Sequence, residues 1–182
     1  MTSLIEKIRI RIGEYLLKRK LEKQDRNVVF HNLKNIKTAG IVFEALPNEN
    51  ITHVKSFITE LKKYGIDTKA LGYAHEHRKH LDLIGGSTIN YVCKEDFNFF
   101  YESKDNVIDE FVSTKFQLLI VYCENDFFPL KYISSLSMAE MKAGEQGICD
   151  ENLDFMIQLT ERKGLYELQK QLVRYLSTIN QK

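Results

Sequence analysis

Histidine and acidic side chains follow two apolar segments of the chain, at positions where a folded protein could use them for chemistry. Glu124 and Asp126 come directly after the most apolar run, and His75 and His77 come after an earlier one. Carboxylates are common groups for general acid and base catalysis and for binding Mg²⁺. Histidines two residues apart lie on the same side of an extended chain and can bind a metal ion. These four residues form the candidate ligand site.

Each of these groups also has a purely structural interpretation. Acidic residues just before a helix that begins near Pro129 are stabilised by the positive end of the helix dipole. Two acids there also oppose the binding of an anion at that helix end. The segment from His75 to Lys79 is polar enough to be a solvated loop. The pattern alone leaves both interpretations open.

The sequence motifs typical of cofactor sites are missing. Cys93, Cys123 and Cys149 form no Cys-x-x-Cys pair, so we expect buried, reduced cysteines. The run Gly85-Gly86-Ser87-Thr88 could cradle a phosphate, but the residues after it are typical of an extended chain, which favours a plain turn. Neither a dinucleotide fingerprint nor a Walker loop is present. We therefore expect no metal ion and no cofactor, and a binding module is favoured over an enzyme.

Positive charge is concentrated at the N-terminus. Residues 1–37 carry a net charge of +6, whereas the other residues together carry −5. Lysine and arginine neutralise phosphates, which predicts docking to RNA or to an RNA–protein particle such as the ribosome. The predicted contacts are seven basic residues: Arg9, Arg11, Lys18, Arg19, Lys20, Lys23 and Arg26.

The basic segment is also predicted to be a helix, over residues 3–24. Ser3 and Glu6 have the spacing of a capping box. An apolar stripe recurs every three to four residues and comprises Leu4, Ile5, Ile8, Ile12, Tyr15 and Leu16. The stripe could pack on the rest of the domain, leaving the cations solvated, or it could pack on another chain in an oligomer or adaptor. An anionic membrane surface is a further alternative, although the stripe contains no Trp or Phe and the chain has no lipidation motif.

The remaining chain alternates between expected strands and helices. Strands are expected at 38–45, 68–74, 88–93, 116–123 and 153–159, and helices at 51–64, 105–112, 129–138 and 164–179. This order predicts an α/β fold with an open, mostly parallel sheet and helices on both faces, Rossmann-like or flavodoxin-like, preceded by the basic amphipathic helix. We divide the chain into residues 1–34, the helix and linker, and residues 35–182, a single α/β domain.

The N-terminus does not have the pattern of an export signal. Glu6, Lys7, Arg9 and Arg11 interrupt any apolar segment there, and no apolar run approaches the roughly 20 residues of a membrane span. A cytoplasmic protein is the expectation.

Several short stretches resemble a family of small Bacteroidota proteins defined by a domain of unknown function. The stretches are Asn35–Ala45, Ala70–Tyr73, Asp96–Phe100 and, above all, Phe127–Ser137. The resemblance implies a Rossmann-like, cytoplasmic protein. It assigns no activity and no catalytic residues.

Overall fold

Six parallel strands form one sheet in the order β3–β2–β1–β4–β5–β6. The computed structural model describes residues 4–147, 149–159 and 164–179, and all elements are given within these residues. The strands are β1 Thr38–Glu44, β2 Asp67–Ala74, β3 Ile89–Cys93, β4 Leu118–Tyr122, β5 Met141–Glu145 and β6 Phe155–Ile157. The helices are α1 Leu4–Leu21, α2 Asn48–Lys63, α3 Asn106–Ser113, α4 Phe128–Leu136 and α5 Gly164–Thr178, with short 3-10 helices η1 Leu33–Asn35, η2 Arg78–His80 and η3 Lys94–Asp96.

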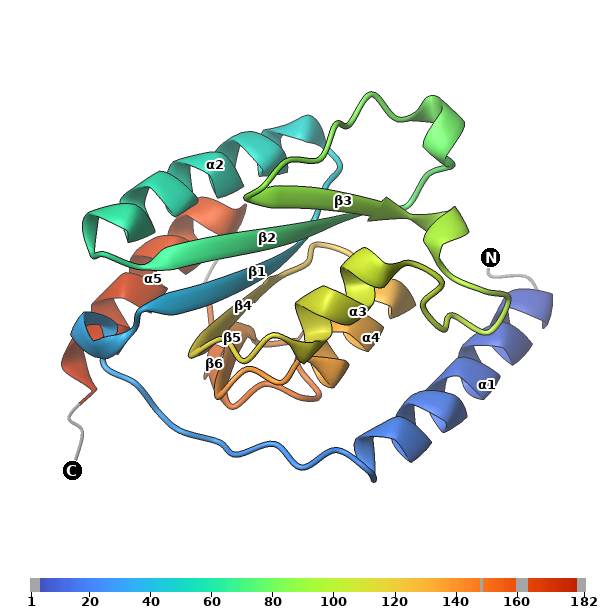
Figure 1. Cartoon of the computed structure of the whole chain (residues 1–182), viewed down its shortest axis with the longest axis horizontal. Helices are drawn as coiled ribbons and strands as arrows, with labels where there is room; N and C mark the ends of the chain where they lie inside the picture. Colours follow the sequence, from blue (N-terminus) through green and yellow to red (C-terminus); the bar gives the residue numbers. More distant parts are fainter. Residues whose placement is uncertain (1–3, 148, 160–163, 180–182) are drawn as a thin grey trace.

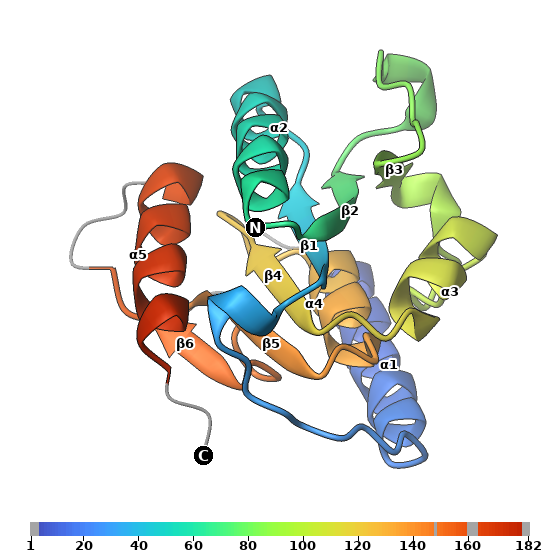
Figure 2. The ribbon, with the colours of Figure 1, turned by 60° about the vertical axis from the view of Figure 1, so that its left-hand side comes forward.

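Helices cover both faces of the sheet, as Figures 1 and 2 show. α2 and α5 pack on one face, α3 and α4 pack on the other, and α1 lies outside α4. The predicted α/β fold, with its parallel sheet and its preceding helix, is confirmed. Among the described residues, no helix is long and apolar enough to cross a membrane.

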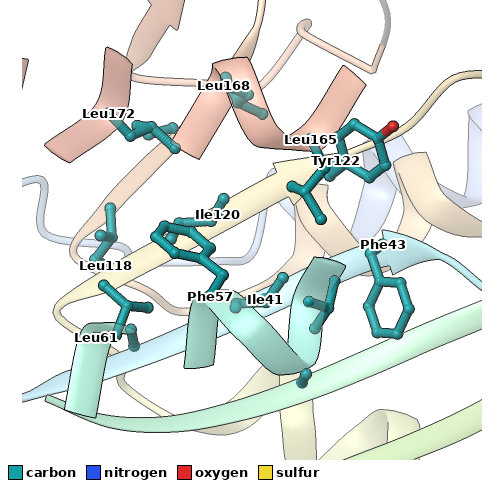
Figure 3. Packing of buried hydrophobic residues seen from close by; sticks show 14 of the residues in the cluster. Ile41, Phe43, Phe57, Leu61, Leu118, Ile120, Tyr122, Leu165, Leu168 and Leu172 are labelled. Carbon is teal, nitrogen blue, oxygen red and sulfur yellow. The ribbon is translucent and has the colours of Figure 1, made fainter. Parts of the chain in front are cut away.

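The central strands are apolar on both faces because both faces are covered. Side chains alternate along a strand, so Ile41 and Phe43 meet α2 and α5, whereas Val42 between them faces α3 and α4. Figure 3 shows Ile41 near Phe57 of α2, with Leu165 of α5 on the same face. The apolar residues on both faces of segments 38–45 and 116–123 thus correctly predicted that β1 and β4 are central strands.

One strand was not predicted. β5, Met141–Glu145, pairs in parallel with β4 and β6, in a segment for which we predicted neither a strand nor a helix. Its pattern is unlike that of a buried strand because it contains a lysine and a glycine. Lys142 is nevertheless buried, and Gly144 has no room for a side chain, since a Cβ there would lie 2.8 Å from the carbonyl oxygen of Val121.

The alternative in which the apolar stripe of α1 packs on the domain does not describe most of the stripe. Gly13 and Leu17 are the buried residues of this helix, whereas Leu4 and Tyr15 of the stripe are exposed. A Cβ at position 13 would lie 3.0 Å from a ring carbon of Phe128, so the missing side chain lets the helix approach α4 closely. The face of Gly13 and Leu17 therefore turns inward, most of the stripe faces solvent, and its members Ile12 and Leu16 are half-buried. Ser3 of the predicted capping box lies outside the described residues.

Candidate functional site

The order of the strands places a topological switch point between β1 and β4. Crevices at the carboxyl ends of such strands are the usual ligand sites of open α/β sheets. Here the crevice is occupied by Glu44, whose carboxylate accepts hydrogen bonds from the backbone N–H groups of Glu124 (3.2 Å) and Asn125 (3.1 Å). The Asn125 side-chain amide donates a third, at 2.8 Å. The switch point is therefore closed by protein groups.

The predicted acidic residues lie at this closed edge. Glu124 accepts a hydrogen bond of 2.5 Å from the hydroxyl of Tyr122. Asp126 is exposed just before α4. Neither residue lines the cavity described next, so the structure does not bring them together with the histidines.

A cavity of about 340 Å³ opens at the carboxyl ends of β2 and β3, beside the switch point. Its walls come from α1, the two strand ends, the loop after β3 and the start of α4, all of which meet at one end of the molecule in Figure 1. The lining residues are Glu6, Arg9, Tyr73, His75, His77, Lys94, Glu95, Phe97, Tyr101 and Pro129. This volume is in the range of small-molecule sites.

His75 is held in one orientation by two aromatic neighbours. Its ring stacks on Phe127 with centroids 4.1 Å apart, and its Nδ1 lies 2.9 Å from the Tyr73 hydroxyl. Burial raises the pKa of Tyr73, so the phenol keeps its proton. Burial, with a smaller contribution from Lys94, lowers the pKa of His75 and favours the neutral imidazole. Nδ1 of His75 is thus engaged by the Tyr73 hydroxyl, whereas Nε2 has no hydrogen-bond partner among the described residues.

Glu95 ties together the loops that follow β2 and β3. Its carboxylate accepts hydrogen bonds from His77 Nδ1 (2.7 Å), from the backbone N–H of Arg78 (3.1 Å) and from Cys93 Sγ (3.2 Å). These bonds, that of Cys93 first, lower the pKa of Glu95 to about 2. Burial raises the pKa of Cys93 to about 12, so this thiol is protonated and is not an activated nucleophile.

An ion pair between the exposed Arg78 and the buried Asp96 joins the same two loops. Asp96 accepts hydrogen bonds from the guanidinium of Arg78 (2.5 Å) and from the backbone N–H of Cys93 (2.7 Å). The Asp96 carboxylate raises the pKa of Arg78. The loops that carry the cavity residues are therefore held together by side chains from η2 and η3, which sequence reasoning did not single out.

α1 supplies a wall of the cavity through Glu6 and Arg9. Arg9 Nε donates to the carbonyl of Phe99 at 2.8 Å, and its guanidinium lies 4.5 Å from the ring centroid of Tyr101. Glu6 accepts hydrogen bonds from Arg9 and from the Tyr101 hydroxyl. Burial raises the pKa of Tyr101 to about 12, with the hydrogen bond to Glu6 as the next cause. The spacing of apolar residues gave no signal that this polar face of the helix points inward.

Lys94 follows β3 and lines the cavity half-buried. No described carboxylate lies within ion-pair distance of its ammonium group. Arg9 forms an ion pair with Glu6, and Glu95 lies 2.7 Å from Nδ1 of His77. Lys94 is therefore the basic residue of the lining that has no carboxylate partner among the described residues.

The seven predicted basic contacts divide into two groups. Arg9 takes part in the cavity wall, Lys20 pairs with Glu102 (3.1 Å) and Arg26 pairs with Asp154 (2.5 Å). The other four are exposed on α1 or just after it, and these are Arg11, Lys18, Arg19 and Lys23.

The glycine-rich run lies away from the cavity. Gly86 donates its backbone N–H to Ile89 at 2.8 Å in a turn that leads into β3. This turn is at the amino end of the strand, whereas the cavity is at the carboxyl end. The chain bends at Ser87 and Thr88 before it enters β3.

Comparison with known proteins yields one match. A model of a family of unknown function, DUF6913, matches residues 9–179. Neither a curated protein nor a solved structure matches the chain. All the cavity-lining residues except Glu6 fall within the matched segment.

Proposed function

The chain belongs to the DUF6913 family of unknown function, and from the site we propose that it binds a small ligand with an acidic group in the cavity beside β2 and β3. One observation carries this proposal. Lys94 and His75 line the same cavity, and neither the Lys94 ammonium nor Nε2 of His75 has a partner among the described residues. A few polar groups in a pocket with apolar walls are typical of small-molecule sites, so a ligand oxygen is the partner that we infer for both.

The walls of the cavity favour a ligand with a flat or apolar part. Phe97 and Tyr101 contribute aromatic rings, and Pro129 closes the side toward α4. Small-molecule sites typically combine such apolar walls with a few oriented polar groups. A ring that carries a phosphate or a carboxylate fits this combination, with its anionic group at Lys94 and His75.

The proposal is binding without covalent chemistry. The thiol of Cys93 is protonated, and burial also raises the pKa of Tyr73 and of Tyr101. The described lining residues thus include no activated nucleophile. His75 is the group placed to exchange a proton with a bound ligand.

Thermal unfolding with small anions tests the proposal. We expect phenyl phosphate or benzoate to raise Tm, and inorganic phosphate to raise it less because it leaves the aromatic walls uncovered. His75→Ala and Lys94→Ala should each remove most of the shift, whereas Lys79→Ala, in the exposed part of the same loop, should leave it intact. Equal shifts in all three variants would show that these anions bind elsewhere, and no shift with any of these anions would contradict the proposal.

Docking to RNA through the basic helix stays a prediction, as do a cytoplasmic location and an origin in Bacteroidota. The observation in its favour is that Arg11, Lys18, Arg19 and Lys23 are exposed. Filter binding of bulk RNA at low and moderate salt tests it, because phosphate contacts weaken as salt is added. Affinity that does not change with salt would rule out this mode of binding.

A further inference from the structure

The outward side of α1 carries large apolar side chains. Leu4 is 74% exposed, Ile5 62%, Ile8 49% and Tyr15 61%. The helix is held on the protein by its opposite side, through Gly13 and Leu17. Exposed apolar residues are unremarkable one at a time, but several on one helix face are typical of an interaction surface.

The loop after β3 brings two phenylalanines to this helix. Phe99 is 54% exposed and Phe100 37%. Arg9 holds the loop beside α1, since its guanidinium bonds the Phe99 carbonyl and lies 4.8 Å from the Phe99 ring centroid. We define the outer apolar face as Leu4, Ile5, Ile8 and Tyr15, with the exposed rings of Phe99 and Phe100 beside the helix. The structure thus brings two phenylalanines, which the helix itself lacks, next to α1.

A row of cations runs alongside this face. Leu4, Ile8 and Tyr15 are spaced by four and seven residues and so form one row along the helix. Lys7, Arg11 and Lys18 have the same spacing three residues later, so they form a neighbouring row, and all three are exposed. The basic row and the apolar row therefore face solvent together.

We propose that α1 lies with its outer apolar face in an anionic lipid surface. An apolar helix face flanked by Lys and Arg is the pattern of helices that lie in the membrane interface. The apolar side chains enter the acyl boundary, and the neighbouring cations pair with lipid phosphates. RNA would satisfy the cations but would leave the apolar face in water. A second copy of α1 would cover the apolar face but would bring two rows of like charge together.

Vesicle co-sedimentation of the full chain tests this proposal. We expect binding to vesicles of phosphatidylcholine with phosphatidylglycerol to be at least about tenfold tighter than to phosphatidylcholine alone. The double variant Ile5→Gln/Ile8→Gln should lose at least about tenfold in affinity, because both side chains enter the apolar boundary. Both residues are exposed, so the fold should tolerate the change, which circular dichroism verifies.

Two matched controls distinguish binding through this surface from nonspecific hydrophobic or electrostatic binding to vesicles. Ile84→Gln removes an isoleucine that is 88% exposed and far from α1 in the sequence, and it should bind vesicles like the unmodified chain. Arg11→Gln/Lys18→Gln should lower the affinity for anionic vesicles, whereas Lys62→Gln/Lys63→Gln at the exposed end of α2 should not.

Three results would overturn the proposal. The first is equal binding to neutral and anionic vesicles, or no binding to either. The second is salt-sensitive binding of bulk RNA that is unchanged in Ile5→Gln/Ile8→Gln, together with absent vesicle binding, which assigns the basic row to RNA. The third is a dimer in solution that Ile5→Gln/Ile8→Gln dissociates, which assigns the apolar face to a second copy.

Discussion

At the scale of single residues, the clearest difference between the sequence pattern and the structure is the buried side chain of Lys142. Lys142 lies inside the sheet region, and its ammonium nitrogen donates to the carbonyl of Ser135 at 2.7 Å. Burial, followed by the nearby charge of Arg26, lowers the pKa of Lys142 to about 7. A lysine in a segment without an apolar pattern is normally interpreted as solvent-exposed, so the sequence pattern indicated neither the strand nor the buried group.

Lys142 should make the stability of the protein depend on pH. In the unfolded chain this lysine holds its proton up to about pH 10.5, whereas in the folded chain it releases it near pH 7. Across that window the unfolded state binds more protons, so the free energy of unfolding should rise with pH. In the unmodified chain the free energy of unfolding should rise by about 4 kcal/mol between pH 6 and 10, and we expect Lys142→Met to abolish this rise.

Urea unfolding of both proteins at pH 6, 8 and 10 measures this difference. The variant should be the more stable one at pH 6, because a buried charge is costly there. At pH 10 the advantage should vanish, because the neutral amine keeps its hydrogen bond and Met leaves the Ser135 carbonyl unpaired. Parallel pH profiles would show that Lys142 does not titrate in this range.

At the scale of elements, the docking of α1 decides what the N-terminal segment does. The helix has two candidate inward faces, the apolar stripe and the face of Gly13 and Leu17. Hydrophobic periodicity predicts the stripe, but close packing on Phe128 and the polar contacts of Glu6 and Arg9 favour the other face. The inward face completes the cavity wall, and the stripe remains free.

A larger residue at position 13 should weaken this docking. The Cβ of Gly13→Val would lie 3.0 Å from both the Phe100 carbonyl oxygen and the Phe128 ring, so α1 would have to move outward. We expect a loss of about 1–3 kcal/mol in the free energy of unfolding, as for other overpacked sites, and faster amide exchange in the helix. Arg11→Val on the exposed side is the control and should change stability by less than about 1 kcal/mol. Unchanged exchange in Gly13→Val would argue against close packing at this residue.

At the scale of the whole molecule, the open cavity lies beside the position that the strand order predicts for a ligand site. The strand order opens a crevice between β1 and β4, where a ligand is expected, but Glu44 and Asn125 fill it. The open cavity lies instead at the ends of β2 and β3, because α1 and the loop after β3 build walls there. The division of the chain at residue 34 stays a prediction, and we propose that the helix is a functional part of the α/β domain.

Much of the architecture was determined by the sequence itself. Apolar runs buried on both faces marked β1 and β4, and the amphipathic periods marked α2 and α5, because burial against a sheet leaves a local pattern in the chain. His75 and His77 were recognised as candidates because they directly follow a strand. These features depend on residues that are close together in the sequence, so they can be predicted from the sequence alone.

The tertiary structure decided which residues meet. Lys94 and Glu95 join the histidines only through the parallel pairing of β2 with β3, and Glu6 and Arg9 reach them from the far N-terminus. The orientation of α1 depended on one missing side chain and on contacts with Phe128, about a hundred residues away. Such choices are made by packing between distant segments, which hydrophobic periodicity does not encode.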